Sequence, residues 1–165
     1  MTRKEFNKSV DLFADGLYRF ILKNIRDVEK ARDIVQETFT KTWLKVEEID
    51  FDKIKSYLFT TAYRTMIDLI RLDDRFVRPK AIDFENKHTY NNYSDLKEIL
   101  DRALAQLPEI QRSVVLLRDY EGYSYEEIGE ITDLTESQVK VYIFRARKNL
   151  KTYLQSIDTV LEINT

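Results

Sequence analysis

The sequence predicts an all-α protein made of two small helical lobes joined by a flexible linker. Apolar residues recur at helical spacing almost throughout the 165-residue chain. This periodicity is lost over residues 76–95, which contain Pro79 and many polar residues, and it then resumes. We therefore predict an N-terminal lobe at residues 1–75, a linker at 76–95 and a C-terminal lobe at 96–165.

Helices are expected along the whole N-terminal lobe. Their apolar positions lie three or four residues apart and so share one face of each helix. These positions are Phe13, Leu17, Phe20 and Ile21; then Ala31, Ile34, Val35, Thr38, Phe39, Thr42 and Val46; then Ile54, Leu58, Ala62, Met66, Leu69 and Ile70. The lobe is thus expected to bury its core between helices.

The C-terminal lobe begins with a periodic stretch over residues 96–107, and Pro108 with Glu109 starts another helix. Two capping boxes follow eleven residues apart, and they mark two further helix starts. The boxes pair Ser124 with Glu127 and Thr135 with Gln138. Thr132, Asp133 and Leu134 form a short turn between these helices, and the small Gly129 lets their backbones approach. This spacing is typical of a helix-turn-helix.

Composition excludes several classes of chemistry. The chain has no Cys, a single His at position 88, and three Gly that do not match phosphate-binding loops. Its many carboxylates form no recognisable acid/base or metal constellation. We therefore expect no catalytic residues, no metal and no cofactor. Without a signal peptide or an apolar run of membrane length, the chain is expected to be soluble and cytoplasmic, without membrane insertion.

The formal net charge of −2 hides separate charged blocks. Residues 53–80 hold seven bases and three acids, and residues 119–136 hold seven acids and no base. Residues 137–151 hold five bases and no acid. Such blocks are often only solvated helix faces, but two basic segments also raise the possibility of nucleic-acid binding.

Three surfaces are candidates for function. On the helix over residues 30–46, a polar stripe opposite the apolar face is either plain surface or a docking face for a basic partner helix. Over residues 53–80, aromatic rings alternate with bases, which suits unpaired nucleic acid, although the rings could equally be core. The outer face of the second helix of the helix-turn-helix could enter a major groove, where polar side chains reach base edges and phosphates.

These three segments, DIVQETFTKTW (33–43), YLFTTAYRTMIDLIR (57–71) and the helix-turn-helix ending in VKVYIFRARKNL (139–150), occur in the order and spacing of a known family. The chain resembles the extracytoplasmic-function (ECF) sigma factors of bacterial RNA polymerase over roughly residues 6–155. The resemblance implies a sigma factor that binds core polymerase and directs promoter recognition, melting and transcription initiation. It also implies three partners: core RNA polymerase, through its β′ coiled coil and β flap, promoter DNA, and an anti-sigma factor.

The resemblance also assigns roles to residues. The polar stripe would bind core polymerase through Asp33, Gln36, Glu37 and Thr40. The minus-ten promoter strand would meet Tyr57, Tyr63, Arg64, Arg71 and Arg75. The minus-thirty-five duplex would meet Thr135, Glu136, Ser137, Gln138, Lys140, Arg145 and Lys148. The chain departs from the family pattern in the second segment, where Arg64 replaces the usual Asn and Leu72, Asp73 and Asp74 replace an Arg run.

Two alternatives stay open. The first is a helix-turn-helix transcription regulator whose N-terminal lobe senses a ligand or dimerises, which leaves the polar stripe at residues 33–40 without an explanation. The second is a sigma-like decoy that only sequesters an anti-sigma factor. A decoy predicts a disabled DNA-binding face, whereas Lys140, Arg145 and Lys148 are present.

Overall fold

The computed structural model describes the backbone of residues 1–76 and 92–163 and the side chains of residues 1–73 and 95–157. The first described part contains α1 (Arg3–Ile25), α2 (Val28–Leu44) and α3 (Ile54–Phe76). Two short 3-10 helices, η1 (Val46–Glu48) and η2 (Phe51–Lys53), connect α2 to α3.

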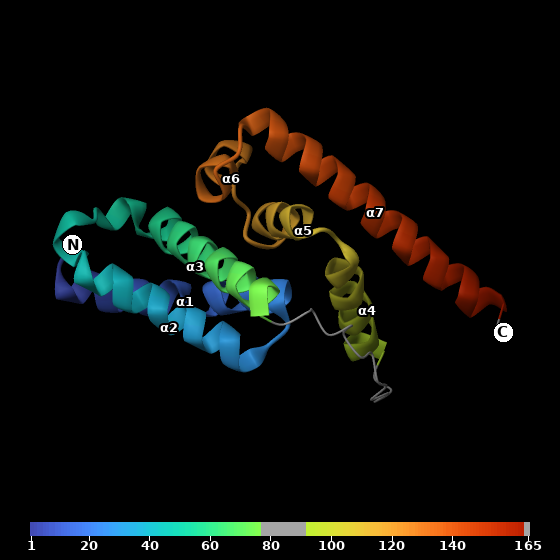
Figure 1. Ribbon diagram of the computed structural model, residues 1–165, viewed down its shortest axis with the longest axis horizontal. Coiled ribbons are helices and arrows are strands. Elements are labelled where there is room, and N and C mark those ends of the chain that lie inside the picture. The colour runs from blue at the N-terminus through green and yellow to red at the C-terminus, as the bar shows by residue number, and fades with distance from the viewer. Residues whose placement is uncertain (77–91, 164–165) are drawn as a thin grey trace.

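The second described part contains α4 (Asn92–Gln106), α5 (Glu109–Val115), the π-helix η3 (Leu116–Tyr120), α6 (Tyr125–Thr132) and α7 (Glu136–Ile163). Figure 1 shows α7 as a long helix along one side of the molecule, with α6 at its beginning. All regular structure in the described ranges is helical, which confirms the predicted all-α class.

Two helix ends differ from the sequence expectation. Helix α4 begins at Asn92 and α3 continues to Phe76, so both helices extend into the stretch predicted as linker. The central part of that predicted linker, residues 77–91, lies outside the described residues. Helix α2 ends before Val46 because Lys45 leaves helical geometry, with φ −114° and ψ 18°, and Val46 instead starts η1.

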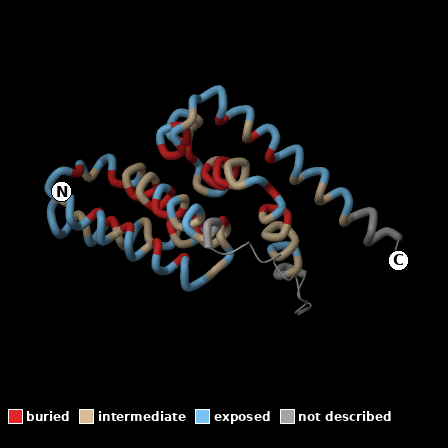
Figure 2. Tube along the Cα trace, viewed as in Figure 1, coloured by how far each residue is buried: buried red, intermediate tan, exposed pale blue. Residues whose placement is uncertain are grey.

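The helices enclose one continuous apolar core to which both lobes contribute. The N-terminal lobe supplies Leu17, Phe20, Leu58, Phe59 and Met66, and the C-terminal lobe supplies Leu116, Leu117, Tyr123, Ile128 and Val139. Figure 2 shows buried stretches in both lobes where their helices face each other. The lobes meet where α1 and α3 pack against α4, α5 and α6. No helix in the described ranges is long and apolar enough to cross a membrane.

Candidate functional site

The polar stripe on α2 is exposed in the structure. Its four members, Asp33, Gln36, Glu37 and Thr40, all face solvent, while Ile34 and Thr38 on the opposite side are buried. The buried threonines of α2 are satisfied within the helix because each hydroxyl donates to a carbonyl one turn earlier, as Thr38 does to Ile34 at 2.7 Å. Helix α2 therefore anchors one face in the core and leaves the acidic stripe accessible.

Two stripe members make local contacts that order them. The Thr40 hydroxyl donates to the Gln36 carbonyl at 2.9 Å. The Glu37 carboxylate pairs with Lys41 one turn later at 3.0 Å, and both side chains are about half exposed. An exposed pair of this kind contributes only about 0.3–0.5 kcal/mol, so Glu37 can exchange Lys41 for a cation on a partner at little cost.

The aromatic and basic face of α3 is only partly accessible. Arg64 and Arg71 are exposed and Tyr57 is half-buried, whereas Tyr63 is only 9% exposed. Burial, reinforced by the carboxylate of Glu109 on α5, raises the pKa of Tyr63 to about 12. The Arg75 side chain lies outside the described residues. The structure thus buries most of Tyr63, with Glu109 of the C-terminal lobe near enough to act on its phenol.

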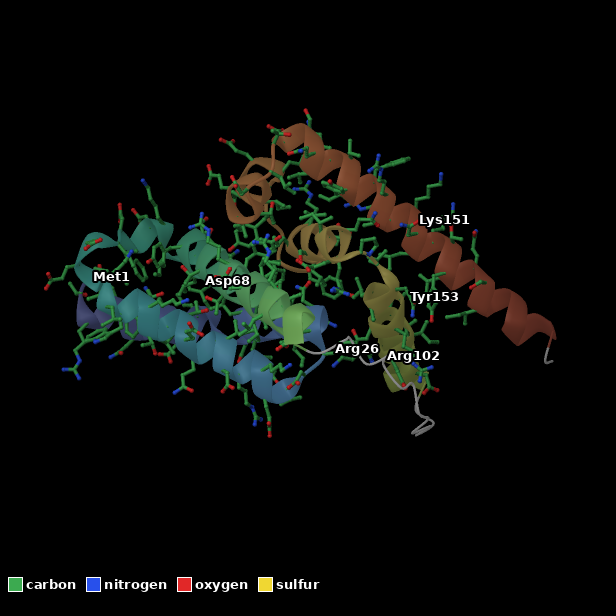
Figure 3. All side chains as sticks on the ribbon, viewed as in Figure 1. Met1, Arg26, Asp68, Arg102, Lys151 and Tyr153 are labelled. Atoms are coloured by element: carbon green, nitrogen blue, oxygen red, sulfur yellow. The ribbon has the colours of Figure 1, made fainter. Side chains whose placement is uncertain are left out.

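A surface pocket of about 380 Å³ lies between α2 and α3. It brings Tyr57 and Arg64 together with residues that the sequence did not single out, namely Lys41, Leu44, Thr61 and Asp68. Lys41 also donates to the Thr65 hydroxyl at 3.1 Å. Figure 3 labels Asp68 on the exposed side of α3. Spacing could have identified Thr61 and Asp68, since they lie four and eleven residues after Tyr57 and so share its helix face.

The turn before α7 has the predicted chemistry. The backbone N–H of Gln138 donates to the Thr135 hydroxyl at 3.2 Å. The backbone N–H of Thr135 donates in return to the Gln138 side-chain oxygen at 2.9 Å, which completes the capping box. Asp133 adopts the left-handed conformation, φ 58° and ψ 47°, that ends α6. At the start of α6, Ser124 caps the Glu127 N–H, but the Glu127 carboxylate accepts from the Ser124 hydroxyl instead of its backbone.

Gly129 allows the close approach that the turn requires. A Cβ atom built at Gly129 would lie 2.6 Å from the Leu134 carbonyl oxygen, closer than real Cβ contacts allow. The Leu134 N–H donates to the Gly129 carbonyl at 3.0 Å. The predicted helix-turn-helix is therefore formed by contacts that only glycine permits.

The outer face of α7 is fully accessible. All seven predicted duplex contacts are exposed: Thr135, Glu136, Ser137, Gln138, Lys140, Arg145 and Lys148. Buried Val139, Ile143 and Ala146 fix the opposite face in the core. Lys140 pairs with Glu136 at 3.4 Å and lies 5.6 Å from the Tyr125 ring centre. The short polar side chains at the start of α7 and the cations after them form one continuous surface.

Two apolar side chains on this surface are missing from the predicted site. Phe144 is 69% exposed and Val141 is 46% exposed, and both lie among the cations of α7. Further along, Lys151 continues the basic side, and Figure 3 labels it on α7. Arg147 is held differently, because the Asp119 carboxylate accepts two hydrogen bonds from it at 2.6 and 3.2 Å and raises its pKa. Arg147 therefore ties α7 to η3.

Comparison with known proteins identifies the family. Residues 10–76 match Sigma-70 region 2, and residues 97–150 match Sigma-70, region 4. The chain is 32% identical over 144 residues to the RNA polymerase sigma factor SigV of Bacillus subtilis, with 86% of each chain covered. It is also 28% identical over 145 residues to the ECF RNA polymerase sigma factor SigM of the same organism, covering 85% of this chain and 89% of SigM. The chain belongs to the ECF sigma factors.

A solved structure shares the arrangement of this sigma factor. The sigma factor RpoE of Bartonella quintana, crystallised with the anti-sigma factor NepR, superposes with a TM-score of 0.76 and 25% identity. The match covers 92% of this chain and 98% of that one. As a sigma factor, the chain binds core RNA polymerase and directs promoter recognition and transcription initiation. The helix-turn-helix regulator with a sensing lobe is the weaker interpretation, because region 2 accounts for residues 10–76.

Proposed function

We propose that the exposed stripe on α2 is the surface through which this ECF sigma factor binds core polymerase. The observation that carries the assignment is the position of Asp33, Gln36, Glu37 and Thr40, which are all exposed on one side of a helix whose other side is buried. Carboxylates and amides on a fixed helix suit a partner helix that presents basic residues, such as an arm of the β′ coiled coil. The C-terminal lobe would contact the β flap.

The two promoter elements are assigned to different lobes, with residues 1–75 and 96–165 acting as the two units. The α3 face with Tyr57, Arg64 and Arg71, together with Tyr63 and Arg75, would bind the minus-ten strand, where rings stack on bases and cations follow the backbone. The start of α7 would enter the major groove of the minus-thirty-five element. Exposed Phe144 and Val141 add apolar surface that can contact thymine methyl groups.

The proposal extends to the cellular location, the role and the regulation of the chain. The chain would act in the cytoplasm as an initiation factor and would itself catalyse no bond chemistry. The Bartonella sigma factor with a similar fold was solved in complex with an anti-sigma factor. By analogy, an anti-sigma factor would control this chain too.

The decisive experiment is the affinity of the chain for purified bacterial core RNA polymerase, with Glu37→Lys as the test variant. Reversing the charge in the middle of the stripe places a cation against a basic partner, so binding should weaken roughly tenfold or more. Asp11→Lys is the matched control, because Asp11 is an exposed carboxylate on α1 outside the stripe. Equal losses in the two variants would remove the stripe from the interface. No binding by a folded wild type would contradict the whole assignment.

A second measurement separates a working initiation factor from a decoy. The free chain is acidic overall, with a net charge of −2, so it should bind promoter duplex poorly, whereas the holoenzyme should bind it well. A gel shift at moderate salt compares the two directly. A holoenzyme that binds promoter and non-promoter DNA equally would indicate a sequestering protein without promoter specificity.

A further inference from the structure

Another surface pocket, of about 730 Å³, lies between α1 and α4, apart from the three surfaces assigned above. Its volume is in the range of pockets that hold small organic molecules. Helix α1 supplies one wall from residues 18–26, α4 supplies another from residues 96–101, and Tyr120 of η3 completes the lining. Figure 3 labels Arg26, at the end of α1, next to α4. The pocket is therefore a candidate ligand site in a part of the chain that has no assigned role.

The inner surface of this pocket is mainly apolar. Half of its lining residues are Leu or Tyr, namely Tyr18, Leu22, Leu96, Leu100 and Tyr120. Leu96 is 57% exposed and Tyr120 is 41% exposed. Single exposed apolar side chains are common on protein surfaces, but these two lie together in one hollow, as in ligand sites. A molecule that fits the pocket must therefore bring an apolar body to cover them.

The charged residues around the pocket are mostly cations. Four lining residues carry a positive charge and one carries a negative charge. The cations are Arg19, Lys23, Arg26 and Lys97, and the acid is Asp101. The chain as a whole has a net charge of −2, so this excess of positive charge is a local feature. A hollow lined by one sign of charge raises the local concentration of ligands of the opposite sign. The pocket therefore favours an anion.

Two of these cations are held in place and still have donors for a ligand. The Lys23 ammonium donates to Asp101 at 2.8 Å and lies 5.0 Å from the Tyr120 ring centre. Arg19 donates two hydrogen bonds to the Glu121 carboxylate, both at 3.1 Å. An ammonium has three N–H donors and a guanidinium has five, so both side chains can bind an anion without leaving these partners. Side chains that are already ordered lose less conformational entropy when a ligand binds.

Lys97 on α4 adds a cation that is open to solvent. Its side chain is exposed, and it pairs with no carboxylate among the described residues. Asp101, one turn later on α4, is paired with Lys23 of α1 instead. An anion in the pocket thus meets positive charge from both helices.

We propose that this pocket binds a free amphipathic anion, a small molecule with an aliphatic or aromatic body and a carboxylate or phosphate head group. The body covers Leu96 and Tyr120, and the head group accepts hydrogen bonds from Lys97, Lys23 and Arg19. A neutral molecule would leave the cations unmatched, and an inorganic anion would leave the apolar wall exposed to water. The site lies apart from the polymerase and promoter surfaces and does not rest on their assignment.

The test measures the binding of laurate, a straight-chain carboxylate, to the full chain by isothermal titration calorimetry, at concentrations below micelle formation. Dodecyltrimethylammonium has the same chain length and the opposite charge, and acetate has the same head group without the chain. The wild type should bind laurate saturably at a single site, roughly tenfold or more tightly than dodecyltrimethylammonium. Acetate should give no saturable binding, because it has no chain to bury.

Two variants each alter one part of the lining. Leu96→Asp places a carboxylate on the apolar wall, and Leu12→Asp is its matched control, because Leu12 on α1 is also 57% exposed and lies outside the pocket. Lys97→Glu reverses a charge of the head-group site, and Lys53→Glu on η2 is its exposed control. Leu96→Asp and Lys97→Glu should each weaken laurate binding roughly tenfold, and the two controls should not change it. All four positions are exposed, so the variants should keep the melting temperature of the wild type without ligand.

Several results would overturn the proposal. A folded wild type that does not bind laurate saturably would exclude the ligand, and equal binding of dodecyltrimethylammonium would remove the role of the cations. Equal affinities of Leu96→Asp and Leu12→Asp would place laurate elsewhere on the chain. Binding to phosphatidylglycerol vesicles without binding to free laurate would mean that the surface recognises a membrane instead. These assays contain neither polymerase nor DNA, so their failure is distinguishable from a failure of the stripe on α2 to bind core polymerase.

Discussion

Two neighbouring helices of the N-terminal lobe present their functional surfaces in opposite ways. The stripe on α2 is entirely exposed, whereas the face of α3 is accessible only in part, since Arg64 and Arg71 are exposed but Tyr63 is only 9% exposed. The difference arises because the C-terminal lobe packs against α1 and α3 through α4, α5 and α6. The proposed polymerase surface on α2 is therefore fully accessible while the lobes are packed together, and the proposed minus-ten surface on α3 is accessible only at some of its residues.

The largest expected effect comes from Phe59→Ala, which removes the α3 ring that packs against Phe20 of α1 and Tyr123 of the C-terminal lobe. Deleting a buried Phe ring costs about 3–5 kcal/mol of unfolding free energy, and here the loss would fall on the contact between the lobes. Urea unfolding gives the energy. Hydrogen exchange should show faster amide exchange in α3 and little change on α2.

Phe6→Ala is the control for this variant. Phe6 also packs against two rings, Trp43 at 5.0 Å and Phe39 at 6.3 Å, but it lies away from the C-terminal lobe and is half-buried. Phe6→Ala should lower the unfolding free energy by less than Phe59→Ala does, and it should leave amide hydrogen exchange in α3 unchanged. Equal exchange in α3 for both variants would show that the cover over α3 does not depend on Phe59.

The titration of Tyr63 reports whether α3 is covered. Its pKa in the folded chain is about 12, against about 10 in an unfolded chain, so the folded chain holds the phenol proton more tightly. Stability from this difference is complete below about pH 10 and falls as the pH rises through 12, by about 1.4 kcal/mol per pKa unit. Subtracting the ultraviolet titration curve of Tyr63→Phe from that of the wild type isolates this one phenol among the ten tyrosines.

A partner variant tests the electrostatic part of that pKa. Glu109 on α5 is the second cause of the shift, after burial. Glu109→Gln should therefore lower the pKa of Tyr63 but leave it above 10. A Tyr63 that titrates near 10 in the wild type would mean that α3 is uncovered in solution, and the contrast between α2 and α3 would disappear.

Gly129→Ala should impair promoter binding by the C-terminal lobe and spare core binding by α2, at a smaller cost in unfolding free energy than Phe59→Ala. The added methyl would lie 2.6 Å from the Leu134 carbonyl oxygen, which forces the turn apart and costs about 1–3 kcal/mol. Promoter binding should fall while core binding through α2 persists. Gly16→Ala is the control, because the nearest atoms to its Cβ are side-chain atoms of Glu121, Arg19 and Phe59, with none of them backbone. Loss of core binding in Gly129→Ala would show that the α2 surface depends on the C-terminal lobe.

The sequence predicted local features well, because each rests on a few neighbouring residues. The second capping box, the turn at Asp133 and the buried face of α2 follow from side-chain chemistry and helical spacing. The contact between the lobes could not be predicted in the same way. Tyr63 lies among bases in the sequence, and only the distant Glu109 and Tyr123 segments, brought together by folding, reveal that it is covered.

Side-chain periodicity also does not predict whether another part of the chain covers a given helix face. Spacing correctly puts Phe144 on the outer face of its helix, where it is 69% exposed, but it leaves Phe59 open between core and surface, and the structure shows Phe59 only 1% exposed. Spacing places a residue on one side of its helix, but the partner that covers this side depends on contacts far along the chain. The π-helix η3 is likewise invisible in the sequence pattern, since it depends on one irregular turn.

The smallest effect is expected for Lys140→Ala, which alters the outer face of α7. This face is exposed while the two lobes are packed together. Lys140 is exposed and pairs only weakly with Glu136 at 3.4 Å, so its loss should leave the fold intact. If its ammonium neutralises one phosphate, the slope of log affinity against log salt should fall by about 0.9 for the duplex complex. Lys97→Ala removes an exposed charge from α4 and should not change the slope. An unchanged slope in Lys140→Ala would mean that this ammonium neutralises no phosphate in the duplex complex.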